Sequence, residues 1–302
     1  MVNLNKKFLR TFGTEAVLDK VKLICKTYNI SPSKSKGQNF LLNREIIGKI
    51  TSVAEIKKED IILEAGPGLG ILTEELVKKA KKIISVELDE KLFNFLKLKF
   101  ADCSKLKLIS GNILDFESGS LIGTADYKIV ANLPYNITSV FLKKFLAATT
   151  VKPQSMSLLV QKEVAQRICA KPGDMSLLSI SVQLYGQPEI VNIVGRENFW
   201  PIPDVDSAIL KIGEIKSKEA VDKYLGGISE KEFWRILKIS FSAKRKQLHN
   251  NLTAGLKISS NEIKKLLKKA NFNPAIRAQN LSIDDWLLLV KEINSYLGNS
   301  AR

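Results

Sequence analysis

The sequence predicts a mixed α/β domain with a largely parallel sheet, followed by a small all-α domain. Between residues 34 and 214, apolar runs of strand length alternate with helical patterns, as in parallel strands joined by helices. After residue 217, apolar residues recur only at helical spacing. The 302 residues, 45% of them hydrophobic, are enough for one large and one small core. We therefore expect a helical extension over residues 1–33, an α/β domain over 34–214 and a helical domain over 215–302.

The first thirty residues predict an amphipathic helix. Ala16, Val17, Val21 and Ile24 fall on one side at helical spacing, and Asn29-Ile30-Ser31-Pro32 ends the pattern. Whether this helix packs on the next domain or takes part in binding stays open.

Seven apolar runs in the large domain have the length of strands and are bounded by turn residues. Five should be strands of a parallel sheet with helical crossovers. The last two flank a turn with Pro201 and Pro203 and should form an antiparallel pair at the end of the sheet. The predicted strands are 61–65, 83–87, 105–109, 127–131, 155–161, 189–194 and 207–212.

The C-terminal domain is predicted from apolar residues three and four positions apart, the spacing of one helix face. No internal repeat or low-complexity segment interrupts it. The three sets are Phe233, Ile236, Leu237 and Phe241, then Ile263, Leu266 and Leu267, then Trp286, Leu287 and Val290.

A glycine-rich segment follows the first predicted strand. The run Ile61-Ile62-Leu63-Glu64-Ala65 leads into Gly66-Pro67-Gly68-Leu69-Gly70, and a helical pattern begins at Ile71. Glycine lets the backbone approach a ligand closely at the carboxyl edge of parallel strands. Because position 71 is Ile, the spacing differs from the dinucleotide fingerprint, which disfavours a pyrophosphate ligand. A tight turn without a ligand is the alternative.

An acidic residue ends the second predicted strand. Glu87 follows the apolar run 83–86, and a carboxylate in this position can accept hydrogen bonds from both hydroxyls of a ribose. Together, the glycine loop and this carboxylate favour a cofactor that contains a ribose.

Four residues after the fourth predicted strand suit an amine substrate. In Asn132-Leu133-Pro134-Tyr135, the Asn side-chain oxygen can accept a hydrogen bond from an exocyclic amine, and the main-chain carbonyl of Pro134 can accept another. The ring of Tyr135 offers a stacking face to a planar base. Such contacts turn the nitrogen lone pair toward an electrophile. The alternative is an ordinary strand end followed by a proline turn.

Taken in order, these segments resemble the small-subunit ribosomal RNA adenine dimethyltransferases, which make N6,N6-dimethyladenosine with S-adenosylmethionine. The resemblance extends from about Ser35 to the C-terminus. It implies a Rossmann-like S-adenosylmethionine-dependent methyltransferase sheet with a small all-α C-terminal domain. The matching segments are Gly37-Gln38-Asn39-Phe40-Leu41, Glu64-Ala65-Gly66-Pro67-Gly68, Glu87-Leu88-Asp89, Asn132-Leu133-Pro134-Tyr135-Asn136-Ile137, Phe199-Trp200-Pro201-Ile202-Pro203-Asp204-Val205-Asp206-Ser207 and Phe241-Ser242-Ala243-Lys244-Arg245-Lys246.

The resemblance implies a set of residues that bind S-adenosylmethionine. Asn39 and Leu41 would contact the cofactor. Gly66 and Glu87 would hold its methionine and ribose parts. Asn132 would lie beside the methyl group.

The resemblance also implies how the target adenine is held. Tyr135 and Phe199 would lie on its two faces, and two aromatic faces can restore much of the stacking that a base loses when it leaves a helix. On its own, Phe199 reads more simply as a core residue. No general base is needed, and the single histidine, His249, is remote in sequence from the cofactor motifs.

One position departs from the family pattern. Relatives have an acidic residue after the third strand, which accepts a hydrogen bond from the adenine amine of the cofactor, whereas this chain has Asn112. An Asn oxygen can accept the same bond, but a neutral acceptor is weaker than a charged one, so we expect weaker cofactor binding. Asp115 is the alternative contact if the loop is shifted.

The charge of the chain suits a polyanionic partner. The net charge is +16, although the basic residues are mostly lysine, as a coding bias would also produce. Two clusters are expected to contact phosphates of the small ribosomal subunit, with solvated helix faces as the alternative. They are Lys244, Arg245 and Lys246, and Lys264, Lys265, Lys268 and Lys269.

The cysteines and the lengths of the apolar runs bear on where the protein is expected to work. Cys25, Cys103 and Cys169 are far apart in sequence and lack a C-x-x-C pair, so neither disulfides nor a metal site is expected. No apolar run reaches membrane-spanning length. We expect a cytoplasmic monomer.

Three functions fit the sequence. The leading one is dimethylation of two adjacent adenosines in the 3'-terminal hairpin loop of small-subunit ribosomal RNA during ribosome biogenesis. The second is the related modification of one adenosine in large-subunit RNA by macrolide-resistance enzymes. The third is a ribosome-assembly factor without catalytic activity.

Overall fold

The computed structural model describes residues 14–33, 37–123 and 126–300, and the chain divides into two compact units. The first unit comprises Met1–Ala165 and Glu189–Gly213, and the second comprises Gln166–Pro188 and Glu214–Arg302. The chain thus crosses between the units near residue 214, where the sequence placed a boundary, and also near residues 165 and 189. The predicted α/β domain over residues 34–214 included residues 166–188, so their grouping with the second unit was not predicted.

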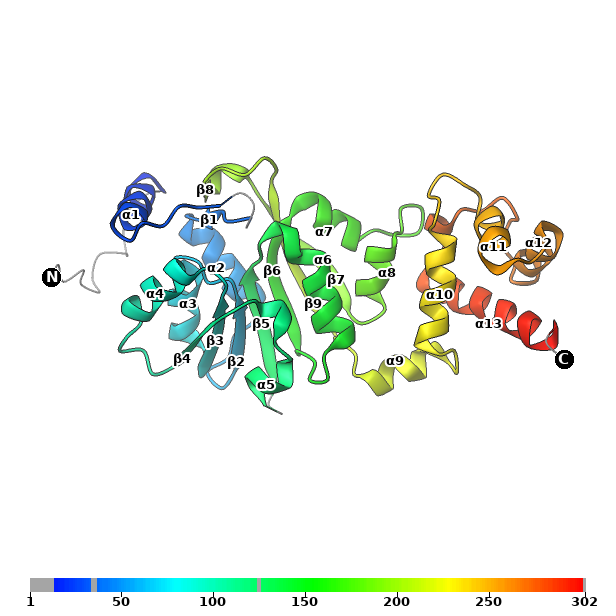
Figure 1. The fold of residues 1–302 in the computed structure, drawn as a ribbon, viewed down its shortest axis with the longest axis horizontal. Coiled ribbons are helices and arrows are strands. Elements are labelled where there is room, and N and C mark those ends of the chain that lie inside the picture. Colours follow the sequence, from blue (N-terminus) through cyan, green and yellow to red (C-terminus); the bar gives the residue numbers. More distant parts are fainter. Residues whose placement is uncertain (1–13, 34–36, 124–125, 301–302) are drawn as a thin grey trace. The chain divides into compact units, whose positions relative to one another are not determined.

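A seven-stranded sheet forms the centre of the first unit, in the order β4-β3-β2-β5-β6-β9-β7 (Figure 1). The strands from β4 to β6 are parallel, and β9 runs antiparallel to β6. All seven predicted strands are present, and the last two are neighbours at one edge as predicted. Their bounds are β2 Ile61–Ala65, β3 Lys82–Glu87, β4 Leu106–Ser110, β5 Tyr127–Asn132, β6 Ser155–Gln161, β7 Gln187–Val194 and β9 Ser207–Gly213.

The core of this unit forms where helix faces meet the sheet. Ile47 and Ile50 of α2 and Leu76 of α3 pack with Ile62 of β2, and all four are at most 1% exposed. Burying one such side chain stabilises the fold by about 1.5–3 kcal/mol. The helical segments of the unit are α1 Thr14–Thr27, α2 Arg44–Val53, α3 Ile71–Lys79, α4 Glu90–Lys99, η1 Ile113–Asp115, α5 Ser118–Ile122, η2 Tyr135–Ile137, α6 Thr138–Lys143, η3 Lys144–Ala148, η4 Arg196–Asn198 and most of α7 Lys162–Ile168.

Two short strands that the sequence did not predict join distant motifs. β1, Phe40–Leu41, pairs antiparallel with β8, Phe199–Trp200, so that Leu41 lies opposite Phe199. The rings of Phe40 and Trp200 stack with their centroids 6.3 Å apart. Strands of two residues carry too little periodicity to be recognised in a sequence.

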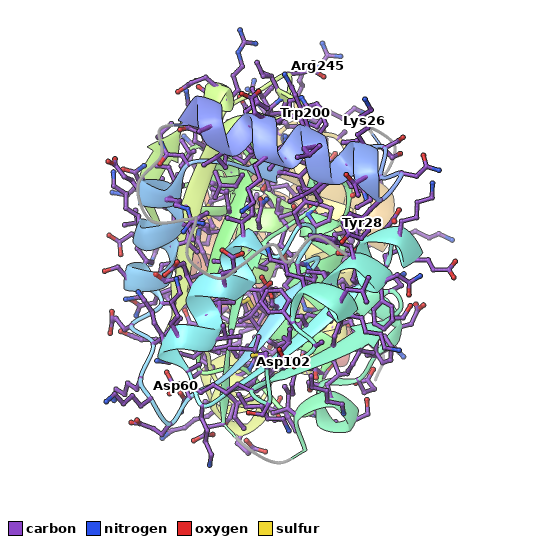
Figure 2. All side chains as sticks on the ribbon, turned by 90° about the vertical axis from the view of Figure 1, so that its left-hand side faces the viewer. Lys26, Tyr28, Asp60, Asp102, Trp200 and Arg245 are labelled. Carbon is purple, nitrogen blue, oxygen red and sulfur yellow. The ribbon has the colours of Figure 1, made fainter. Side chains whose placement is uncertain are left out.

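The N-terminal helix α1 packs on the rest of the first unit, which is one of the two roles that its sequence left open. Val21 and Cys25 are buried against Phe40 and Phe95, and Tyr28 meets the Phe95 ring edge-on at 4.9 Å. Figure 2 looks onto this helix, with Lys26 and Tyr28 near its end and Trp200 beside it. The first thirteen residues of the predicted extension lie outside the described residues.

The second unit is helical, as predicted for the C-terminal part of the chain. Phe233, Leu237, Ile263 and Trp286, all predicted core residues, are fully buried. Within the described ranges, no helix is long and apolar enough to cross a membrane. The helices are α8 Leu177–Gln183, α9 Lys218–Leu225, α10 Glu230–Ser240, α11 Leu248–Leu256, α12 Ser260–Lys269, η5 Ala278–Asn280 and α13 Ile283–Ser300.

Candidate active site

A cavity of about 350 Å³ lies in the first unit, at the carboxyl ends of β2, β3, β4 and β5. Parallel strands bring the loops that follow them to one edge of a sheet, which is where ligands bind in open α/β folds. The segment Gly37–Leu41, which precedes the sheet in sequence, also lines the cavity. Eight of the nine predicted site residues line it: Asn39, Leu41, Gly66, Glu87, Asn112, Asn132, Pro134 and Tyr135.

The glycine loop takes a backbone shape that other residues adopt with strain. Gly66 and Gly70 have φ angles of +67° and +72°. A Cβ atom on Gly70 would lie 2.7 Å from side-chain atoms of Leu96 and Phe100, so a side chain does not fit there. Gly66 faces the ring of Pro134. The loop is therefore close to the segment that follows β5.

Glu87 is held rigidly at the end of β3. Its side chain is buried, Oε2 accepts a hydrogen bond from the Gly68 amide at 3.0 Å, and Oε1 accepts one from the Asp89 amide at 2.9 Å. Burial raises the pKa of this carboxyl, and the two amide donors oppose that shift. Each carboxylate oxygen has a further lone pair, so Glu87 can still accept hydrogen bonds from ribose hydroxyls.

Asn112 lines the cavity, but its side-chain oxygen already has a partner. Oδ1 accepts a hydrogen bond from the Leu114 amide at 3.0 Å and so caps the short helix η1. The second lone pair of Oδ1 and the Nδ2 donor are then the parts of the amide left for a ligand. Asp115, the alternative contact, is exposed and is not among the residues that line the cavity.

Asn132 lines the cavity, and the nitrogen of its side-chain amide already has a partner. Its Nδ2 donates to the main-chain oxygen of Asn39 at 3.2 Å, which leaves Oδ1 available for an amine. The carbonyl of Pro134, predicted as a second acceptor, already accepts the amide of Ile137 at 3.2 Å as the chain turns into η2. The roles of both groups toward a substrate stay predictions.

Tyr135 is half-buried, and its hydroxyl is tied to the start of β9. Its Oη lies 2.7 Å from Oγ of Ser207, which is fully buried. Burial raises the pKa of the Tyr135 phenol, so the hydroxyl is neutral and hydrogen-bonded. The sequence contained Ser207 in a matching segment but did not indicate this partnership, because 72 residues separate the two side chains.

Phe199 is the one predicted site residue that does not line the cavity. It is 1% exposed, lies opposite Leu41 in the β1–β8 pair and belongs to the same hydrophobic cluster as Ile47 and Ile50. The simpler sequence interpretation, a core residue, matches this position. A stacking role toward adenine stays a prediction and would require the ring to become accessible.

Glu64 was not predicted as a site residue, although it belongs to a matching segment, and it lines the cavity. It is 1% exposed on β2, with Oε2 bound to the hydroxyls of Thr73 and Ser85 at 2.8 and 2.6 Å. Its signal in the sequence was a carboxylate inside the apolar run 61–65, a position where charge is rarely buried without a reason.

The two predicted basic clusters lie in the second unit. Lys244, Arg245 and Lys246 are exposed in the loop between α10 and α11, and Asn251 holds that loop by donating to the carbonyls of Ser240 and Ala243 at 2.6 and 3.1 Å. Of the cluster on α12, Lys265, Lys268 and Lys269 are exposed and Lys264 is partly buried. Lys269 forms an ion pair with Glu292 at 2.6 Å, so it is the member least available to a partner.

His249 is buried in the second unit, and its Nδ1 lies 3.1 Å from the carbonyl oxygen of Pro274. This position is typical of a histidine with a structural role. None of the three cysteines forms a disulfide.

The largely parallel sheet, the glycine loop, the carboxylate at the end of β3 and the Asn-Leu-Pro-Tyr segment define an S-adenosylmethionine-dependent methyltransferase. The family model for ribosomal RNA adenine dimethylases matches residues 31–295, and the chain belongs to that family. The resemblance inferred from the sequence is thereby confirmed, as are the methyltransferase fold, the enzyme class and the cofactor.

Curated relatives agree with this assignment. A protein of Dehalococcoides mccartyi named ribosomal RNA small subunit methyltransferase A is 40% identical, over 93% of this chain and 95% of its own length. A protein of the same name in Clostridioides difficile is 37% identical, over 91% and 95%.

Two solved structures are also similar. A dimethyladenosine transferase from Plasmodium falciparum is 30% identical, with a TM-score of 0.68, and covers 84% of this chain and 96% of its own. The 23S rRNA methyltransferase ErmE is 24% identical, with a TM-score of 0.65 over 85% of this chain and 100% of its own, and it shares the fold.

Proposed function

We propose that this enzyme transfers methyl groups from S-adenosylmethionine to N6 of two adjacent adenosines in the 3'-terminal hairpin loop of small-subunit ribosomal RNA, during ribosome biogenesis. The observation that carries this proposal is the orientation of Asn132. Asn132 and Tyr135 both line the cavity, and the Nδ2 of Asn132 is bound to Asn39, so Oδ1 is the atom left to accept a hydrogen bond from an exocyclic amine. The names of the relatives support the small subunit as the source of the substrate.

The cavity suits S-adenosylmethionine, which supplies a methyl group bound to a positively charged sulfur. Glu87 would accept the ribose hydroxyls, and the positive φ angles of Gly66 and Gly68 let the backbone approach the methionine part. Asn39 and Leu41 would close the cavity from the segment before α2, and Asn112 would contact the adenine ring.

In this mechanism the protein acts by positioning rather than by removing a proton first. Asn132 Oδ1 accepts one N–H of the target amine, which aims the nitrogen lone pair at the methyl group and stabilises the positive charge that develops on nitrogen. Tyr135 stacks on the base, with its hydroxyl held by Ser207. After transfer, the acidic nitrogen releases its proton to water.

The second methylation makes a stricter demand on the site. A monomethylated amine retains a single N–H, so it can satisfy only one acceptor. Asn132 Oδ1 would be the acceptor that serves both rounds, because the Asn132 amide is oriented by its bond to Asn39, whereas one lone pair of the Pro134 carbonyl is already used by the Ile137 amide. The pocket then needs room for the first methyl group.

We further propose that the enzyme is a cytoplasmic monomer and binds the small subunit through its basic residues. Lys244, Arg245 and Lys246 are exposed on a loop anchored by Asn251, and their charge would attract phosphates.

The test is methyl transfer from labelled S-adenosylmethionine to unmethylated small subunits, large subunits and naked RNA, with the product nucleoside identified by mass. We expect dimethyladenosine in the 3'-terminal hairpin of the small subunit. Label in the large subunit would indicate the resistance-type reaction instead. Binding to small subunits without transfer would indicate an assembly factor.

A further inference from the structure

The charge of the cavity is opposite to that of the protein. The chain carries a net charge of +16, yet the described residues that line the cavity include the carboxyls of Glu64 and Glu87 and no Lys, Arg or His. The negative electrostatic potential in such a cavity favours binding of a positively charged ligand. S-adenosylmethionine carries one positive charge more than its demethylated product, S-adenosylhomocysteine, because the product lacks the sulfonium.

Of the two carboxyls, Glu64 is incompletely satisfied. Glu87 has an amide donor on each oxygen, whereas both hydroxyl donors of Glu64 bind Oε2. Oε1 of Glu64 is buried and has no hydrogen-bond partner. An ionised oxygen in that position is unfavourable unless a donor or a cation comes close to it.

The charged groups around Glu64 do not neutralise it. Glu87 on β3 repels a negative charge on Glu64, and Lys99 on α4 attracts it weakly. Lys99 is itself committed, since its Nζ pairs with Glu74 of α3 at 2.8 Å and donates to the carbonyl of Leu69 at 2.7 Å. Burial, the dominant influence, raises the pKa of Glu64 to about 7.

We propose that Glu64 is the residue through which the cavity senses the positive charge of its cofactor, so that it favours S-adenosylmethionine over the demethylated product. The unpartnered Oε1 is ionised when the cationic cofactor is present and is partly protonated in the empty cavity. This inference rests on the cofactor assignment and is independent of which RNA is methylated.

A proton linkage follows from this role. Binding of the cation favours ionised Glu64, so it releases a proton when Glu64 starts protonated. Affinity for S-adenosylmethionine should therefore be highest above pH 7 and should fall as the pH drops below 7. S-adenosylhomocysteine, with one charge fewer, should show a weaker dependence.

The experiment is calorimetric titration of the full-length protein with each cofactor, at pH 6, 7 and 8, in phosphate and in Tris. These buffers differ in their enthalpy of ionisation, so the difference in heat counts released protons. At pH 7 we expect S-adenosylmethionine to release about half a proton. The preference for S-adenosylmethionine over S-adenosylhomocysteine should rise about 3- to 10-fold from pH 6 to pH 8.

Glu64→Gln keeps the shape and an acceptor for Thr73 and Ser85 but cannot ionise. It should bind S-adenosylmethionine without proton release and with a preference independent of pH. Asp115→Asn, which removes an exposed carboxyl outside the cavity, is the matched control and should behave like the wild type. Equal proton release by wild type and Glu64→Gln would overturn the proposal and leave the cofactor assignment intact, whereas a wild type that binds neither compound would overturn both.

Thermal unfolding of the cofactor-free proteins gives a second readout. The folded-state pKa of Glu64, about 7, lies above its ordinary value of 4.5, so ionising Glu64 destabilises the fold as the pH rises from 4.5 to 7. Glu64→Gln should therefore melt higher than the wild type at pH 8, and this gain should be absent at pH 5. A purely structural carboxylate predicts a lower melting temperature at both pH values, which would contradict the proposal. If the variant does not fold, absence of proton release by the wild type at pH 6, 7 and 8 is sufficient to overturn it.

Discussion

The cavity of the first unit and the basic loop of the second unit use polar residues in different ways. In the cavity, Glu87, Asn112 and Asn132 each have a hydrogen-bond partner within the protein that fixes the position of the side chain. In the loop, Lys244, Arg245 and Lys246 are exposed. A positioned acceptor contributes through its geometry, whereas exposed cations contribute through charge that salt screens. Loss of a positioned acceptor in the cavity should therefore lower activity more than loss of the exposed cations of the loop.

The largest effect should come from Asn132→Ala. Loss of Oδ1 removes the acceptor that orients the amine, so we expect kcat to fall about 10³-fold while binding of S-adenosylmethionine and of small subunits is retained. Single-turnover methyl transfer and calorimetry would measure the two properties. Asn132→Asp, which keeps an acceptor but loses the donor to Asn39, should be less severe. A kcat close to that of the wild type in Asn132→Ala would rule out the assigned role.

A smaller effect is expected when the basic loop is neutralised. Changing Lys244, Arg245 and Lys246 together to Ala should weaken binding to small subunits about 10- to 100-fold. The slope of log K against log salt concentration should also become shallower, by the amount expected for the loss of about two to three phosphate contacts. Binding measured between 50 and 300 mM salt, about the range in which such contacts are lost, provides the slope.

The matched control removes the same charge elsewhere in the second unit, by changing the exposed residues Lys218, Lys223 and Lys231 to Ala. If the control and the loop variant have the same affinity and slope, total charge rather than the loop accounts for binding. Equal slopes for the loop variant and the wild type would show that the loop is a solvated surface that makes no phosphate contacts.

Ser207→Ala tests whether Tyr135 needs the hydrogen bond between its hydroxyl and Ser207. The Tyr135 hydroxyl would lose its partner, at a free-energy cost of about 1–2 kcal/mol, so we expect KM for small subunits to rise several-fold with an unchanged Kd for S-adenosylmethionine. Tyr135→Phe should have a similar effect. The double variant should be no worse than either single one, because both remove the same bond. Additive effects would show that the two residues act separately.

The smallest effect should come from Asn112→Asp. One carboxylate oxygen would keep the cap on the Leu114 amide and the other would replace the Nδ2 donor with an acceptor for the adenine amine. We expect the Kd for S-adenosylmethionine to fall about 3- to 10-fold, measured by calorimetry. Asp115→Asn serves as the control in this loop. An unchanged Kd would point to a main-chain contact with adenine.

Local patterns were sufficient to predict much of the site. Glu87 and Asn132 end β3 and β5, the glycine loop follows β2, Asn112 lies just after β4, and all line the cavity. Because the carboxyl ends of parallel strands meet at one edge, a correct list of strands already brings these residues together. Phe199 is outside this logic, because its neighbours depend on a pairing between segments about 160 residues apart, and its stacking role stays a prediction.

The sequence by itself determined the seven strands of the central sheet, the helical nature of the C-terminal part and the family, because periodicity and short motifs are properties of neighbouring residues. Only the tertiary structure decided which atoms are available for chemistry. It placed α1 on the domain, grouped residues 166–188 with the second unit, buried Phe199, gave Tyr135 its partner in Ser207 and left one oxygen of Glu64 without a donor. These outcomes depend on contacts between residues distant in sequence, and no local pattern encodes them.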